Sequence, residues 1–92
     1  MTFILLEHAP NRLRGILTRW MVEPHPNVFV GQINARVRDR LFDQISRQIE
    51  DGAVLMIYEA RNEQGYMIRT IGDTSHVSVD FDGLYLVAPR NS

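Results

Sequence analysis

The sequence lacks cysteine altogether and contains no lysine among its 92 residues. The absence of cysteine excludes disulfides, thiolate zinc sites and cysteine nucleophiles, and it fits a reducing compartment. Serine-nucleophile motifs, glycine-rich phosphate loops and zinc-ligand spacings are missing as well. No apolar run approaches membrane-spanning length, and the opening MTFILL is too short for a signal-peptide core and has no basic flank. We therefore expect a cytoplasmic protein that does not associate with membranes.

All ten basic residues are arginine. Arginine forms forked hydrogen bonds to phosphate and carboxylate that lysine cannot form, but a biased genomic base composition also replaces lysine with arginine. The formal net charge is −1, yet residues 1–47 hold seven arginines against four acidic residues, whereas residues 48–92 hold three against seven. A nearly neutral chain can therefore present a basic face to a polyanion.

Apolar periodicity predicts the elements of the N-terminal half. Residues 3–6 form a continuous apolar run, which is typical of a strand covered on both faces. After Pro10 we predict a helix that must end before Pro24. The apolar stripe of this helix comprises Leu13, Ile16, Leu17, Trp20 and Met21. A short strand near 22–24 is predicted to pair with a strand over 28–31 across the turn between them.

The same patterns continue in the second half of the chain. Asn34 is a good N-cap, and the helix after it is predicted to run to about Asp51, with Gly52 as its C′ residue. Three strands are predicted to follow, over 53–60, over 66–72 and within 81–89, and the first two form a hairpin.

This order predicts an α+β, ferredoxin-like fold of the βαββαβ type with one antiparallel sheet, two helices on one face and a C-terminal strand. We expect a single domain over residues 1–92, in which residues 83–92 form the last strand and tail. The other face of the sheet needs a cover if valine, leucine and isoleucine alternate onto it. In so short a chain a second copy is the expected cover, which predicts a homodimer.

Glu7 ends the first predicted strand, and Arg12 and Arg14 follow in the first turn of the helix. Two arginines beside the free N–H groups of a helix start favour phosphate binding. Glu7 is a candidate metal ligand with Mg²⁺ as the candidate cofactor, but one carboxylate holds Mg²⁺ poorly, so a second Glu7 from a two-fold partner would be required. The alternative is structural: Glu7 pairs with Arg12 or Arg14 or accepts from the N–H groups of the helix start, and the two arginines, on opposite flanks of the apolar stripe, form a solvated helix edge.

The second predicted helix carries further arginines. One of its faces holds Arg36, Arg40, Asp43 and Arg47. Asp43 and Arg47 form an i,i+4 pair, so we predict a salt-bridged surface here rather than a nucleic-acid groove. Arg38 falls within the arc of the apolar stripe, where an arginine either extends its charged end at the rim or reaches toward a site.

Three segments carry a resemblance to a known family. They are PNRLRGILTRWMVE (10–23), NVFVGQINARVRD (27–39) and VDFDGLYLV (79–87). On these segments the chain resembles CRISPR-associated protein 2 of type I-E systems, the small subunit of the spacer-acquisition complex. The middle segment is the most specific, because it joins a V-x-V-G strand to a polar cap and a basic helix start.

The resemblance implies a homodimer at the centre of a complex, with a dimer of the CRISPR integrase (CRISPR-associated protein 1) on each side. It implies a non-catalytic platform that binds double-stranded protospacer DNA without sequence specificity, while the integrase performs the transesterification. By position, the implied phosphate contacts fall on Arg12, Arg14, Arg36 and Arg38. The implied partner-binding strand, which adds to a neighbouring sheet, contains Leu84, Tyr85, Leu86 and Val87.

Two positions depart from the family pattern. Relatives outside this subtype carry an aspartate where this chain has Glu7, and metal-dependent nuclease activity has been attributed to it. The alternative function is therefore a metal-dependent endonuclease of RNA or DNA, centred on Glu7 at the dimer axis. A relative within the family carries two arginines where this chain has Ser75 and His76. Two expected contacts with the DNA backbone are therefore missing in each subunit. A third class is a small-molecule regulatory module or a single-strand RNA-binding module. The RNA-binding version would need exposed aromatic residues on the central strands, for which Tyr58 and Tyr66 are the candidates.

Overall fold

The structure is a computed structural model, and it describes residues 1–73. Its elements are β1 (Thr2–Glu7), α1 (Asn11–Leu17), β2 (Val22–His25), β3 (Val28–Gly31), α2 (Ala35–Gln48), β4 (Ala53–Glu59) and β5 (Tyr66–Ile71). The strand predicted within 81–89 lies outside the described residues. Neither of the two described helices is long and apolar enough to cross a membrane.

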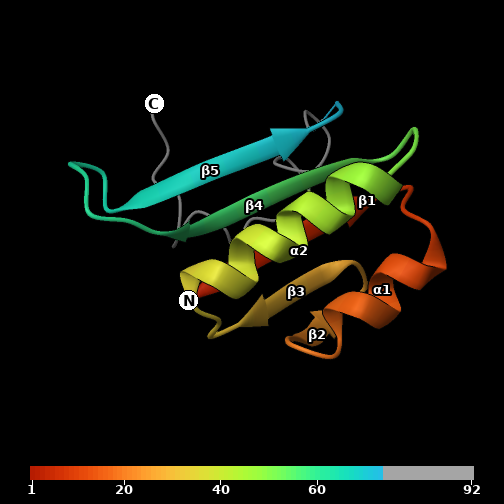
Figure 1. Ribbon diagram of the computed structural model, residues 1–92, viewed down its shortest axis with the longest axis horizontal. Coiled ribbons are helices and arrows are strands. Elements are labelled where there is room, and N and C mark those ends of the chain that lie inside the picture. Colours follow the sequence, from red (N-terminus) through yellow and green to blue (C-terminus); the bar gives the residue numbers. More distant parts are fainter. Residues whose placement is uncertain (74–92) are drawn as a thin grey trace.

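The five described strands form one sheet in the order β2-β3-β1-β4-β5, and each neighbouring pair is antiparallel. The central strand is β1, whose Ile4 lies opposite Phe29 of β3 on one side and Met56 of β4 on the other. The segments β1-α1-β2 and β3-α2-β4 are split βαβ units. Both helices lie on the same face of the sheet (Figure 1). The predicted α+β, ferredoxin-like fold is therefore confirmed for the described part of the chain.

The main core lies between the two helices and the sheet. It is built from alternate residues of the strands and from the apolar stripes of the helices, because side chains alternate along strands and recur every three to four positions along helices. Its buried members are Ile4, Leu6, Leu13, Leu17, Met21, Phe29, Leu41, Phe42, Ile45, Ile49, Val54 and Met56. This packing fixes where the two helices place their outward-facing residues.

The opposite face of the sheet is apolar as well. Leu5 of β1 and Leu55 and Ile57 of β4 are buried there, and the half-buried Phe3 and Tyr66 pack against them. Strands β1 and β4 are thus apolar on both faces, which explains why their sequences form continuous apolar runs. The homodimer predicted to cover this face remains a prediction.

The first helix is shorter than predicted. It ends at Leu17, and the N–H groups of both Trp20 and Met21 donate to the carbonyl of Leu17. The three-residue spacing of the first of these bonds tightens the chain, so Trp20 leaves the apolar stripe and the residue is 54% exposed, whereas Met21 is buried. The prediction that Trp20 belongs to the core was wrong, because it extended a regular helical period through this turn.

The end of α2 also differs from the prediction. The helix ends at Gln48, and Glu50 rather than Gly52 adopts the left-handed backbone conformation, with φ 56°. A Cβ atom on Gly52 would lie 2.6 Å from the carbonyl oxygens of Glu7 and His8. Gly52 therefore allows the start of β4 to approach the end of β1, and this close approach positions Glu7.

Candidate nucleic-acid interface

Glu7 stands at the end of β1, where its half-buried side chain borders a hollow of about 130 Å³. His8, Asp51 and Asp73 also line this hollow. Within residues 1–73 no three histidine, cysteine, aspartate or glutamate side chains gather as a metal-binding group. A Mg²⁺ ion at Glu7 would therefore need ligands from outside this part of the chain, and the metal role of Glu7 remains a prediction.

Arg12 joins the start of α1 to the end of α2. Its Nε donates to Oε1 of Gln48 at 2.7 Å, and one of its terminal nitrogens lies 3.6 Å from Oε2 of Glu50. The Arg12 side chain is 61% exposed. Exposed ion pairs contribute at most about 1 kcal/mol, so a phosphate can displace Glu50 from this guanidinium at little cost.

Arg14 is held on the other flank of α1 by the β2–β3 turn. Its Nε donates to Oε2 of Glu23 at 3.1 Å, and its Nη2 donates to Oδ1 of Asn27 at 2.6 Å. The backbone N–H of Asn27 donates to the same Glu23 oxygen at 2.8 Å, and the carbonyl of Asn27 accepts from the N–H of Leu6 at 3.0 Å. These bonds fix the guanidinium, which is still partly exposed.

The two arginines at the start of α1 are held by separate sets of partners. Arg12 and Arg14 have their partners on opposite flanks of the helix, and neither is paired with Glu7. The predicted structural pairing of Glu7 with these arginines is therefore not formed. Periodicity did not single out Glu23 or Asn27, because their contacts with Arg14 form only when the hairpin folds against α1.

Arg38 lies at the rim of the core, which agrees with the first of the two interpretations drawn from the sequence. Its guanidinium stacks over the ring of Tyr58 at 3.8 Å, and its Nε donates to Oδ1 of Asp39 at 3.1 Å. Arg69 of β5 donates to the same Asp39 oxygen at 3.1 Å and stacks over Phe42 at 4.1 Å. Arg38 is only 19% exposed, so this network holds it against the sheet.

The outer face of α2 is only partly the salt-bridged surface that we predicted. Asp43 pairs with Arg47, which confirms that i,i+4 pair. Arg36 and Arg40 are exposed and have no hydrogen bond or ion pair within residues 1–73. Sequence pattern alone did not separate the paired Arg47 from Arg36 and Arg40, which are unpaired within the described residues, because the arginine that pairs with Asp43 depends on the side-chain conformations.

The two groups of predicted phosphate contacts lie at opposite ends of the helix layer. Arg12 is bonded to Gln48 at the end of α2, whereas Arg36 is in the first turn of the same helix. Twelve residues of helix separate Gln48 from Arg36, which corresponds to about 18 Å along the axis. The described structure therefore distributes its exposed guanidinium groups along the helix layer and does not concentrate them at one point.

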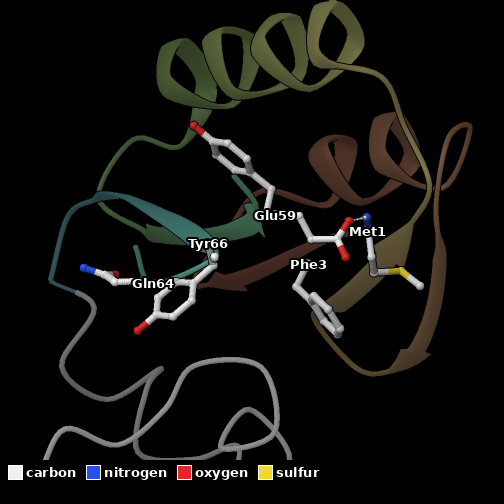
Figure 2. A pocket seen from close by; sticks show the side chains of 7 residues that line it. Met1, Phe3, Glu59, Gln64 and Tyr66 are labelled. Atoms are coloured by element: carbon white, nitrogen blue, oxygen red, sulfur yellow. Dashed lines mark hydrogen bonds and ion pairs between the residues drawn. The ribbon is translucent and has the colours of Figure 1, made fainter. Parts of the chain in front are cut away.

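An aromatic hollow of about 300 Å³ lies near the start of β1. Its lining residues are Met1, Phe3, Tyr58, Glu59, Gln64, Gly65 and Tyr66. Figure 2 shows Phe3 and Tyr66 on the same side of the sheet, and the N-terminal amine of Met1 paired with Glu59 at 2.9 Å. Tyr58 instead packs against the helix-side core, so Tyr58 and Tyr66 are on opposite faces and form no common stacking platform for RNA bases.

A family model described as CRISPR-associated protein (Cas_Cas2CT1978) matches residues 1–86. The chain belongs to this family. The resemblance found in the sequence is thereby confirmed at the level of the CRISPR-associated protein 2 type, and the chain has a role in the CRISPR system.

The match to the Cas_Cas2CT1978 family covers every element that the structure describes. It therefore includes the candidate metal ligand Glu7 and all the arginines discussed above. The predicted partner-binding residues of the last strand lie outside the described residues, as do Ser75 and His76. The described part of this family member thus contains the candidate phosphate contacts, and the candidate integrase contacts lie beyond it.

Proposed function

We propose that this chain is a non-catalytic, dimeric scaffold of the CRISPR adaptation complex that binds the CRISPR integrase and protospacer duplex DNA during spacer acquisition. The observation that carries the proposal is the distribution of arginine along the helix layer. Arg12 and Arg14 flank the start of α1, and Arg36 is exposed in the first turn of α2, whereas Arg38, the fourth predicted contact, is held against Tyr58 at the sheet.

An extended row of cations suits a polyanion better than a single phosphate ligand. Each DNA strand presents one phosphate about every 3.4 Å along the helix axis, so the roughly 18 Å between the two ends of α2 corresponds to about five phosphates. Arginine contacts of this kind hold the phosphate backbone and do not read base edges. The proposed binding is therefore independent of sequence.

The dimer and the integrase contact complete the proposal. On the face of the sheet away from the helices, Phe3 and Tyr66 are half-buried and Ile68 is exposed, and homodimers bury apolar surface of this kind. The integrase would pair with the strand that contains Leu84, Tyr85, Leu86 and Val87, through β-augmentation. Removing residues 83–92 should abolish co-elution with the integrase, and retained co-elution would contradict this assignment.

Duplex binding is tested with Arg14→Ala in the complex with the integrase. The variant should bind the duplex more weakly, and the slope of log K against log salt should fall by about 0.9 for each phosphate that is no longer neutralised. Arg61→Ala is the matched control, because Arg61 is an exposed arginine in the β4–β5 turn and belongs to neither helix. An unchanged salt slope for Arg14→Ala would contradict the role of Arg14.

The competing function is a metal-dependent endonuclease centred on Glu7. The observation that favours it is that the Glu7 carboxylate is half-buried at a strand end and is not neutralised by Arg12 or Arg14. Glu7→Gln should be assayed for RNA and DNA cleavage with Mg²⁺ and for spacer acquisition. Loss of cleavage with acquisition intact would mean that the nuclease activity is real but not needed for spacer acquisition. Loss of both would refute the non-catalytic scaffold.

A further inference from the structure

The outermost ridge of α2 carries a charge pattern that the preceding assignments do not use. With 3.6 residues per turn, Arg36, Arg40, Asp43 and Arg47 lie within one narrow sector of the helix, opposite its buried stripe. We propose that Arg40 is a further phosphate-binding residue, which extends the contact at Arg36 along this ridge. The inference rests on the proposed duplex-binding function and adds a residue to the same interface.

Arg36 and Arg40 face the same way, whereas Arg38 does not. Arg40 is one turn from Arg36, about 6 Å along the axis, on the exposed side of α2. Arg38 is turned by roughly half a revolution from this sector, and it stacks over Tyr58 at the sheet. A ligand that approaches the outer face of α2 therefore meets Arg36 and Arg40 first.

The two carboxylates of α2 already have partners. Asp39 accepts from both Arg38 and Arg69, and Asp43 is paired with Arg47. The two ridge arginines consequently retain their full charge, and neither has a partner within residues 1–73. A polyanion that binds here does not have to displace an intramolecular ion pair, in contrast to the situation at Arg12.

This placement opposes the stability of the isolated helix. Like charges at i and i+4 repel each other, and cations near a helix N-terminus interact unfavourably with its dipole. The first turn of α2 contains no acidic residue to offset them. Sequences that accept such a local conflict commonly do so at functional sites, and a bound phosphate backbone would remove both unfavourable effects.

The spacing of the two arginines is compatible with a phosphate backbone. Phosphates of one DNA strand recur about every 3.4 Å along the helix axis, so two side chains about 6 Å apart at their bases can contact two phosphates of the same strand. Two guanidinium groups at this spacing can also hold a single phosphate, so the choice of a nucleic acid rests on the proposed duplex-binding function. The ridge therefore fits the backbone of a nucleic acid, and the proposed function makes this the protospacer duplex.

The test compares Arg40→Gln with Arg47→Gln in the full chain bound to the integrase, with a duplex of arbitrary sequence as the probe. Arg47 is the matched control, because it lies on the same ridge but is already paired with Asp43. Arg40→Gln should weaken binding several-fold at low salt and lower the salt slope by about 0.9 for each phosphate that the variant no longer neutralises. Arg47→Gln should change both quantities less.

Thermal unfolding without DNA separates a binding role from a structural one. Arg40→Gln should leave the melting temperature unchanged or raise it, since it relieves repulsion from Arg36. Unchanged affinity and slope in Arg40→Gln, with a clear loss in Arg14→Ala, would overturn the inference and leave the proposed function intact. A lowered melting temperature in Arg40→Gln would also overturn the inference. If the wild-type complex showed no salt-dependent duplex binding, the proposed function itself would be refuted.

Discussion

The close approach of β4 to β1 at Gly52 leads to a sharp stability prediction. In Gly52→Ala the added Cβ would lie 2.6 Å from the carbonyl oxygens of Glu7 and His8 and 3.0 Å from the carbonyl carbon of His8. Real Cβ atoms essentially never approach other heavy atoms more closely than 3.0 Å. All three of these atoms belong to the backbone, so no side-chain rotation can relieve the contact.

The size of the destabilisation depends on how far the backbone must shift to accept the new Cβ atom. Glu7 is paired with Ala53 in the β1–β4 ladder, so relief requires β1 and β4 to separate at this end. Overpacking of a filled site costs about 1–3 kcal/mol, and each ladder hydrogen bond that is broken costs about 1 kcal/mol more. We expect Gly52→Ala to lower the free energy of unfolding by about 3 kcal/mol, which corresponds to a melting temperature lower by about 12–24 °C for a chain of this size.

The assay is urea and thermal unfolding followed by circular dichroism at one fixed protein concentration, because a dimer would make stability depend on concentration. Gly15→Ala is the matched control. Gly15 lies inside α1, and a Cβ atom added there would have no atom of another part of the chain within 4 Å. Alanine at this position should therefore stabilise the protein by about 1 kcal/mol through helix propensity. A Gly52→Ala protein within about 0.5 kcal/mol of wild type would refute the reasoning.

Two further predictions concern α2 and the Arg14 site. Glu50→Gly should have a free energy of unfolding about 0.5–1 kcal/mol higher than Glu50→Ala, because glycine adopts the positive φ of this position without strain. Both variants lose the same exposed ion pair with Arg12, so the comparison isolates the backbone effect. Equal urea midpoints would contradict this prediction. Glu23→Gln should strengthen duplex binding and steepen its salt dependence, because it removes the carboxylate charge that offsets Arg14 while an amide oxygen can still accept from Asn27; weaker binding in a titration would contradict it.

Sequence pattern was sufficient for the fold where one physical cause dominates. The apolar runs of β1 and β4 predicted central strands because both faces of these strands are buried, and Asn34 predicted the start of α2 because its side chain accepts from the N–H of Val37 at 2.8 Å. It failed at Trp20 and Glu50, where a tightened turn and a non-glycine left-handed residue depart from the commonest way of ending a helix. Neither departure has a local signature in composition or period.

The candidate site was predictable in its residue types and not in its connections. Arg12 and Arg14 were found from their place after the first strand, but their partners depend on tertiary packing. Gln48 is 36 positions from Arg12 in the sequence, and Asn27 is 13 positions from Arg14. A single sequence carries no information on such pairs until the strand order and helix placement are known.

The structure also bears on why the chain uses arginine in place of lysine. Biased base composition would place arginine everywhere without regard to geometry, whereas selection for its forked group would act only where the fork is used. Arg14 uses two of its nitrogens on two different acceptors, and Arg38 stacks its planar group over Tyr58 while donating to Asp39. Lysine has neither the fork nor the planar face for these contacts. At Arg40, which has no such contact within residues 1–73, lysine would supply the same charge to a phosphate, so the described contacts account for arginine at Arg14 and Arg38 and not at Arg40.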